Sequence, residues 1–304
     1  MASSSRRPPA PERNVLAIFG ATASGKTAVA GALRERLHAT VVSADSAALY
    51  RDLPILTAAP PYPAELVGVV PLHEDVSVGW YQRRAHAAID AAAVPLVVGG
   101  TGLYFRAALA ALELPPALPE RRAHWQAAVD RIGPEAAHAL LAERDPAAAA
   151  RVHANDRKRL VRALELAEAG HSLAPQRDAL WTRETRRPTT IVALDLPLDV
   201  LDGRIALRTR AMAEHGAADE AQRAWSQPLS ATARKVLGLE EFATLPLDDA
   251  VEAVTAATRR LARYQRKWLR RMPNVTTLDA DRPPEEIADE IVALGRAGER
   301  LSRH

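Results

Sequence analysis

Short apolar runs alternate with helical patterns along much of this chain. Four runs have the length and composition of buried strands, at residues 15–19, 40–44, 95–98 and 191–196. The alanine-rich stretch 27–37, between the first two runs, has helical spacing. Parallel strands are usually joined by helices, so this alternation is typical of a parallel sheet flanked by helices. The pattern therefore predicts an α/β fold.

A long helical stretch interrupts the alternation. Residues 119–187 show no strand pattern and are rich in Arg, Ala and Leu, so we expect an all-helical insertion there. The α/β core then comprises 14–118 and 188–304, with a final helix over 281–293. Residues 1–13 lack the apolar segment of a secretory signal and are expected to form a disordered, solvated tail.

Composition excludes several classes of protein. Of the 304 residues, 48% are apolar and 25% are charged, which is ordinary for a globular protein, and no apolar run is long enough to span a membrane. The chain has no cysteine, so disulfides, thiolate metal sites and a cysteine nucleophile are ruled out. Its 40 basic and 37 acidic residues leave a net charge of +3, which does not by itself indicate nucleic-acid binding. We expect a cytoplasmic protein.

The first predicted strand leads into a phosphate-binding loop. The segment GATASGKT matches the pattern G-x-x-x-x-G-K-[ST], and a helix is predicted directly after it. Backbone N–H groups of such a loop, and the positive end of the helix, favour a polyphosphate. Lys26 is one of only four lysines in the chain and is expected to reach the terminal phosphate, while the Thr27 hydroxyl is a candidate ligand of Mg²⁺. The predicted diphosphate- or nucleotide-binding residues are Gly20, Ala21, Thr22, Ala23, Ser24, Gly25, Lys26 and Thr27.

Polar residues also follow the second and third predicted strands. The segment SADSAALY places Asp45 where the ligand crevice of an open α/β sheet lies, so Asp45 is a candidate general base or magnesium ligand. Its alternative role is to cap the next helix. The segment GGTGLY places Thr101 either beside a ligand or in a tight turn. No acidic residue ends this third strand, which weakens a nucleoside-triphosphatase interpretation.

Two segments are strongly basic. Residues 258–271 (TRRLARYQRKWLRR) hold seven basic residues and no acidic one. On a helix, Leu261, Tyr264 and Trp268 are expected to form an apolar seam beside a face of arginines. A second basic group lies in the first turns of the helix predicted after residue 156. A solvated face is one explanation of each, but two such segments together with a phosphate loop favour contact with a nucleic-acid backbone.

Taken together, these motifs resemble those of the tRNA dimethylallyltransferase family, whose members prenylate an adenine in the anticodon loop of tRNA. The resemblance extends over residues 15–279. It depends on GATASGKT, on SADS and LYR within 43–51, on GGTGLY, on H-x-N-D-x-x-R-x-x-R-A-L-E at 153–165, on R-I-x-x-R-x-x-x-M-x-x-x-G at 204–216, and on the basic segment 258–271.

The resemblance implies a specific reaction, in which the dimethylallyl group of dimethylallyl diphosphate moves to the N6 amine of adenine 37 and pyrophosphate leaves. It implies a P-loop NTPase-like core whose phosphate loop holds the diphosphate with Mg²⁺. Asp45 would accept the amine proton, while Thr101 and Arg208 would stabilise the departing pyrophosphate. The insertion would bind the anticodon stem–loop, and a monomer is expected. The implied tRNA-binding residues are Asp45, Ser46, Ala47, Ala48, Thr101, Arg122, Lys158, Arg159, Leu160, Val161 and Arg162.

Some positions depart from the family pattern. Ala48 stands where the family usually has a glutamine that helps to bind the adenine, Ala59 stands where a lysine is common, and Tyr264 replaces an arginine. Three other functions remain open: a small-molecule kinase that uses ATP at the loop, prenylation of a free adenine nucleotide, and RNA binding with an inactive loop. A kinase leaves the basic insertion without a role, and prenylation of free nucleotide predicts no tRNA-binding insertion.

Overall fold

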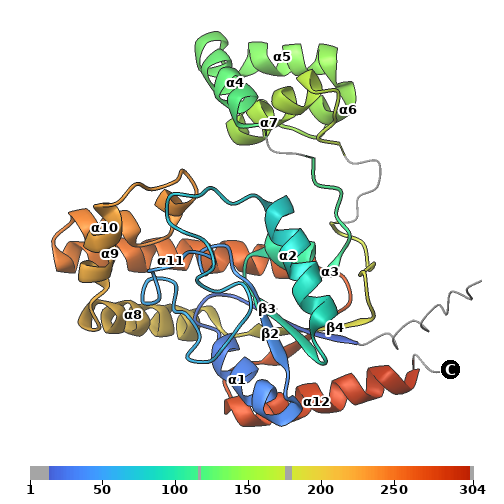
Figure 1. The fold of residues 1–304 in the computed structure, drawn as a ribbon, viewed down its shortest axis with the longest axis vertical. Coiled ribbons are helices and arrows are strands. Elements are labelled where there is room, and N and C mark those ends of the chain that lie inside the picture. The colour runs from blue at the N-terminus through green and yellow to red at the C-terminus, as the bar shows by residue number, and fades with distance from the viewer. Residues whose placement is uncertain (1–13, 116–117, 175–179, 302–304) are drawn as a thin grey trace, which may run out of the picture. The chain divides into compact units, whose positions relative to one another are not determined.

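The core of the molecule is a five-stranded parallel sheet (Figure 1). The computed structural model describes residues 14–115, 118–174 and 180–301, so the tail predicted at 1–13 lies outside the described residues. The order across the sheet is β2-β3-β1-β4-β5, and every neighbouring pair is parallel. The predicted α/β fold class is confirmed. The strands are β1 (Val15–Gly20), β2 (Thr40–Ala44), β3 (Pro95–Gly99), β4 (Thr189–Asp195) and β5 (Val275–Asp279).

The sequence pattern did not predict β5. Its residues VTTLD contain three polar side chains, and only Leu278 is buried, because the strand lies at the edge of the sheet beside β4. Backbone pairing with β4, in which Val192 aligns with Thr276, forms this strand without a strong apolar signal.

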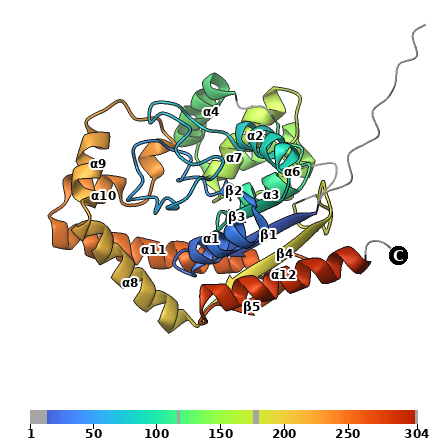
Figure 2. The same ribbon diagram turned by 60° about the horizontal axis from the view of Figure 1, so that its bottom comes forward.

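Helices cover both faces of the sheet. The helices of the core are α1 (Lys26–Leu37), α2 (Val78–Ala91), α3 (Gly102–Leu109), α8 (Leu198–Glu214), α9 (Ala217–Trp225), α10 (Leu239–Thr244), α11 (Leu247–Leu269) and α12 (Pro284–Leu301), with a 3-10 turn at Ala233–Lys235. Successive side chains of β1 point to opposite faces. Ile18 is buried with residues of α1 and α12, whereas the Phe19 ring packs edge-on against Phe105 of α3, with 5.2 Å between ring centroids. The ribbon views show α1 and α12 on the other side of the strands from α2 and α3 (Figures 1 and 2). Helix α12 extends beyond the predicted end at residue 293.

A separate helical unit interrupts the core. It comprises Leu112–Ala179 and contains α4 (Pro119–Ile132), α5 (Pro134–Arg144), α6 (Pro146–Ala149) and α7 (Arg157–Glu168). Each of the first three begins with a proline, whose fixed φ suits the first helical position. The unit has its own apolar centre, which includes Trp125, Leu141, Leu160 and Leu164. No helix in the described part of either unit is long and apolar enough to cross a membrane.

The helical unit differs from the predicted insertion at both ends, starting at 112 instead of 119 and ending at 179 instead of 187. The side chain of Arg106, on α3, explains the second difference. Arg106 is 1% exposed, and its guanidinium donates hydrogen bonds to the backbone carbonyl oxygens of Leu180, Thr182 and Glu184. These bonds attach the returning chain to α3 and therefore to the core.

Candidate active site

The predicted phosphate loop connects β1 to α1 and has the backbone geometry that its glycines permit. Gly25 has φ of +88°, a conformation that other residues rarely adopt. At Gly20 a Cβ atom would lie 2.6 Å from the Ser24 hydroxyl oxygen and 2.9 Å from the carbonyl oxygen of Leu194, so no side chain fits there. Lys26 is folded back, and its Nζ donates to the carbonyl oxygen of Ala21 at 2.7 Å.

Thr22 of this loop is held by two residues distant in sequence. Its backbone N–H donates to Oε1 of Gln265, on α11, at 2.7 Å. Its hydroxyl oxygen accepts a hydrogen bond from Nη2 of Arg208, on α8. Arg208 and Gln265 therefore connect α8 and α11 to the loop after β1.

A cavity of about 170 Å³ lies at the carboxyl ends of β1, β2 and β3, where ligands bind in open α/β sheets. One part of its lining is polar and one part is apolar. The polar and charged lining residues include Thr22, Lys26, Thr27, Ser43, Asp45, Arg208 and Gln265. The apolar ones include Leu56, Met212, Val236, Leu237, Val254 and Leu261. An anionic group and an apolar group can thus occupy the same cavity.

Burial and charge together shape the polar part of the cavity. Removal from water lowers the pKa of Lys26 to about 8; the nearby positive charge of Arg208 acts in the same direction, and Asp45 opposes it. Burial also lowers the pKa of Arg208, and Asp45 again opposes the shift. Ser24 Oγ and Arg208 Nε are buried without a hydrogen-bond partner among the described residues. An anion in the cavity would stabilise both cations and offer an acceptor to Arg208 Nε.

Asp45 and Thr101 lie in adjoining turns. Oδ1 of Asp45 accepts the N–H of Ala47 at 2.9 Å, which stabilises the turn after β2. The hydroxyl oxygen of Thr101 accepts the N–H of Ser46 at 3.4 Å. Ala47 and Ala48 line the cavity, while Thr101 contacts the turn that carries Asp45 instead of lining the cavity itself. The structure thus brings the loops after β1, β2 and β3 together.

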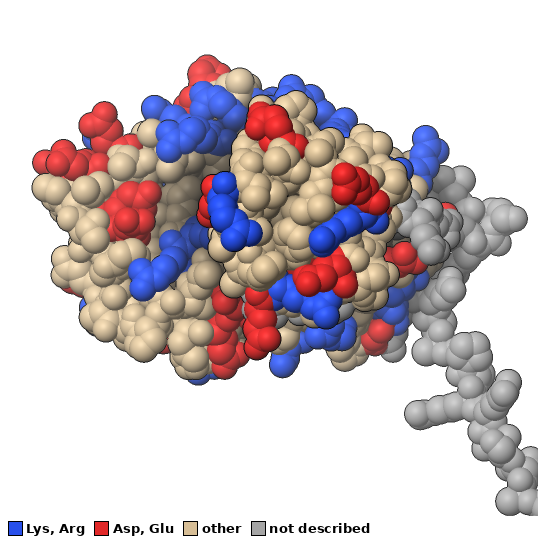
Figure 3. Space-filling view, turned by 90° about the horizontal axis from the view of Figure 1, so that it is seen from above, with Lys and Arg blue, Asp and Glu red and all other residues tan. Residues whose placement is uncertain are grey.

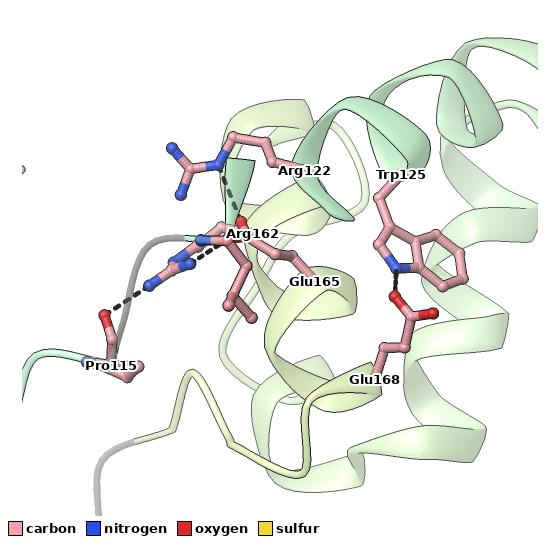
Figure 4. A network of polar contacts seen from close by, with 7 residues as sticks. Pro115, Arg122, Trp125, Arg162, Glu165 and Glu168 are labelled. Carbon is pink, nitrogen blue, oxygen red and sulfur yellow. Dashed lines mark hydrogen bonds and ion pairs between the residues drawn. The ribbon is translucent and has the colours of Figure 1, made fainter. Parts of the chain in front are cut away.

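The helical unit arranges its predicted tRNA-binding residues in two groups. Arg122 and Arg162 both contact Glu165, whose side chain is fully buried, and Arg162 also donates to the carbonyl oxygen of Pro115 (Figure 4). Lys158 and Arg159 are exposed at the start of α7, and no ion pair involves them among the described residues. The first group holds the unit together, and the second is available to a ligand.

Two residues in the predicted tRNA-binding run belong to the interior instead. Leu160 is 0% and Val161 5% exposed, and both pack in the apolar centre of the helical unit. Their positions on α7 place them on the face opposite Lys158 and Arg159. Their side chains therefore stabilise the unit and do not form its basic surface.

The expectation for the basic helix α11 was wrong in its choice of buried face. Leu261 and Tyr264 are 37% and 56% exposed, and the buried side of this segment is formed by Thr258, Ala262 and Gln265. Gln265 packs against the phosphate loop and the turn after β3, where there is little room. Ala262 belongs to the apolar core, and Thr258 lines the cavity.

Several arginines of α11 form ion pairs within the core. Arg263 pairs with Asp202 at 2.7 Å, and Arg266 pairs with Asp195 at 3.0 Å. These pairs neutralise part of the basic face. Figure 3 shows the same tendency more widely, because basic and acidic side chains are interspersed on the face in view.

Two contacts in this region had no signal in the single sequence. One is the hydrogen bond between Gln265 and the Thr22 N–H, because a glutamine in a basic segment is expected to be solvated. The other is the packing of Trp268 on Gly102, where a Cβ atom would lie 2.1 Å from the indole ring. In the sequence, a tight turn was a sufficient explanation for Gly102. The structure shows that Trp268 of α11 packs so close to Gly102 that a side chain is excluded.

These features define a phosphate-loop α/β enzyme whose substrate site combines cations, a carboxylate and an apolar wall. Comparison with known proteins identifies the family. The model of the IPP transferase family matches residues 48–272, and that of the isopentenyl transferase family matches 13–73. A tRNA dimethylallyltransferase of Anaeromyxobacter dehalogenans is 40% identical over 291 residues, which cover 90% of this chain and 97% of the relative.

Solved structures agree with the family models. The tRNA isopentenylpyrophosphate transferase of Bacillus halodurans has a TM-score of 0.67 and 29% identity, over 96% of this chain and 100% of that one. A eukaryotic dimethylallyltransferase that acts on tRNA, at 23% identity and a TM-score of 0.72, shares the fold over 88% of this chain and 74% of its own. The chain belongs to the tRNA dimethylallyltransferase family, which is a family of prenyltransferases. The predicted resemblance is confirmed, and the family is not one of kinases.

Proposed function

We propose that this protein transfers the dimethylallyl group of dimethylallyl diphosphate to the N6 amine of adenine 37 in the anticodon loop of tRNA. The N6 nitrogen forms a bond to the allylic C1 carbon, the bond between C1 and the diphosphate oxygen breaks, and the nitrogen loses one proton. The observation that best supports this proposal is the single cavity that combines the phosphate loop, Asp45 and an apolar wall.

The diphosphate would occupy the polar part of the cavity. Negative charge grows on the leaving group as the C1–O bond breaks, so cations fixed beside it stabilise the transition state more than the ground state. Lys26 and Arg208 supply two such cations, and both are held by contacts with the phosphate loop. The unpartnered Arg208 Nε would find an acceptor in the phosphate oxygens.

Magnesium fits this end of the cavity. Mg²⁺ bound with phosphates keeps several waters and takes only one or two protein ligands. Thr27 is an exposed residue at the start of α1 and lines the cavity, and no cluster of three or more His, Cys, Asp or Glu side chains able to hold a metal is found among the described residues. We assign Thr27 as the protein ligand, with the diphosphate and water molecules supplying the others. When bound, the ion adds positive charge at the leaving group.

Asp45 would accept the proton of the N6 amine. Its carboxylate lines the same cavity as Lys26 and Arg208, and the hydrogen bond from Ala47 to Oδ1 fixes the side chain while Oδ2 can face the substrate. Thr101 supports the turn from the other side through Ser46. A base held in position in this way contributes roughly 10²- to 10⁴-fold to a proton-transfer step.

The helical unit would bind the tRNA backbone through Lys158 and Arg159, which are exposed and clustered at the start of α7. An anticodon loop is a suitable target because its nucleotides are unpaired. The adenine can therefore leave the stack at small cost and enter the cavity.

The test is a transfer assay with matched acceptors. The protein is incubated with Mg²⁺ and radiolabelled dimethylallyl diphosphate, and with an anticodon stem–loop that carries A37, the same stem–loop with G37, AMP or ATP. We expect label only in the A37 stem–loop. Label in AMP or ATP would overturn the proposed acceptor, and consumption of ATP without transfer would overturn the proposed donor.

A further inference from the structure

Glu220 is a buried carboxylate with an unusual pair of partners. It lies on α9, is 3% exposed, and belongs to none of the sequence motifs considered above. Its two oxygens accept hydrogen bonds from consecutive backbone N–H groups, Ile55 to Oε2 at 2.9 Å and Leu56 to Oε1 at 2.8 Å. A charged acceptor shared by two amides makes a strong contact.

These amides begin a single helical turn. The N–H of Thr57 donates to the carbonyl oxygen of Leu53, that of Ala58 to Ile55, and that of Ala59 to Pro54. The first N–H groups of such a turn have no partner within it. Glu220 supplies the acceptor from 165 residues away, and the turn ends at Ala58 in the left-handed conformation, with φ of +48°.

The same turn forms one wall of the substrate cavity. Leu56, Thr57 and Ala58 all line it. The Leu56 side chain is 8% exposed and lies close to Gly238, where a Cβ atom would be 3.3 Å from Leu56 Cδ2. Leu56 thus stands at the apolar part of the cavity, beside Val236 and Val254.

We propose that Glu220 is a positioning residue that holds the Leu56 wall in place and thereby limits the prenyl group to five carbons. This inference rests on the proposed function for the identity of the donor. Without the two hydrogen bonds the turn can move outward, which enlarges the apolar part of the cavity and leaves Lys26, Thr27 and Arg208 unchanged. A longer prenyl diphosphate then binds better relative to dimethylallyl diphosphate.

The experiment measures Kd by titration calorimetry for dimethylallyl diphosphate and for geranyl diphosphate, with Mg²⁺ and without tRNA. The variants are Glu220→Ala and Glu220→Gln, with Asp219→Asn as the control, because Asp219 is an exposed acidic residue of the same helix. We expect the preference for dimethylallyl diphosphate to fall about tenfold in Glu220→Ala, which is the lower end of the discrimination that one methylene group gives in an apolar pocket. Glu220→Gln keeps one acceptor, so its preference for dimethylallyl diphosphate is expected to fall less. Asp219→Asn is expected to have the same preference as the wild type.

A second variant separates positioning from general destabilisation. Leu56→Ala removes the wall directly and leaves Glu220 in place, so it should shift the same ratio. A purely structural role for Glu220 would lower the fraction of folded protein, and hence binding of both donors equally, without changing their ratio. An unchanged ratio in folded Glu220→Ala overturns the inference. Binding of both donors without transfer to tRNA would contradict the proposed function alone, and binding of neither would contradict both.

Discussion

Oε1 of Gln265 accepts the backbone N–H of Thr22 at 2.7 Å, although the two residues are 243 positions apart. One belongs to the phosphate loop and the other to the basic helix α11. Gln265 is 4% exposed. Its side-chain Nε2 lies over Gly100, where a Cβ atom on residue 100 would be only 2.6 Å from that nitrogen. The glutamine therefore packs between the loops after β1 and β3.

Gln265→Leu should weaken donor binding. The substitution keeps most of the volume but removes the acceptor of the Thr22 N–H, which is worth about 1 kcal/mol or a little more when buried. We expect KM for dimethylallyl diphosphate to rise roughly five- to tenfold. Tyr264→Leu, on the exposed side of the same helix, is the control and should leave this KM unchanged. Equal donor KM values in the two variants would show that the hydrogen bond has no role in the site.

Asp45→Asn should slow transfer strongly and preserve the fold. Asparagine keeps the Oδ1 acceptor that binds the Ala47 N–H, but it has no carboxylate to take a proton. We expect the single-turnover rate to fall by roughly 10² to 10⁴ while the midpoint of thermal unfolding stays the same. Normal turnover in this variant would reduce Asp45 to a residue that stabilises the turn.

Donor binding should depend on the protonation of Lys26. Its pKa is about 8 in the free protein, so the cation is present below pH 8 and is lost as the pH rises through this value. A bound diphosphate favours the charged form and raises this pKa. Affinity should therefore fall as the pH rises through about 8, and binding near pH 8 should take up protons. Calorimetry in two buffers of different ionisation enthalpy measures the uptake, and Lys26→Met should abolish it.

Glu165→Gln should destabilise the helical unit. Glu165 is fully buried and accepts from Arg122, Arg162 and the Leu118 N–H. Removing its charge leaves two arginines without their anion, at a cost of about 2–3 kcal/mol in the free energy of unfolding of this unit. Glu168→Gln is the control, because the exposed Glu168 accepts, among the described residues, only from the Trp125 indole N–H, and glutamine can do the same. Amide hydrogen exchange in α4 and α7 measures the stability of the helical unit in both variants. Equal protection of these amides in Glu165→Gln and Glu168→Gln would contradict the prediction.

Arg159→Ala should weaken tRNA binding and reduce its salt dependence. Arg159 is exposed, and the loss of one phosphate contact lowers the slope of log K against log salt by about 1. Arg157→Ala is the matched control. Arg157 already forms an ion pair with Asp130, so its charge contributes less to binding a phosphate. Filter binding between low and moderate salt tests both variants. If the two slopes agree, the exposed cation of α7 is only a solvated residue.

Much of the site followed from local sequence. The phosphate loop, the turn at Asp45 and the turn at Thr101 each come directly after a predicted strand, and parallel strands end at one edge of the sheet. Their meeting was therefore predictable once the parallel sheet was expected. The motifs also carried the resemblance to the family, because several short patterns in a fixed order are far more specific than one.

The fold class, the phosphate loop and the family could thus be predicted from the amino-acid sequence, since they depend on contiguous patterns and on strand order. Which residues of each pattern are buried depends on packing between distant parts of the chain. Gln265, Glu220 and Arg106 bind backbone atoms far away in the chain, and such contacts leave no periodicity in the sequence. The edge strand β5 and the buried side of α11 were decided in the same way, because their neighbours, and not their own composition, set how they pack.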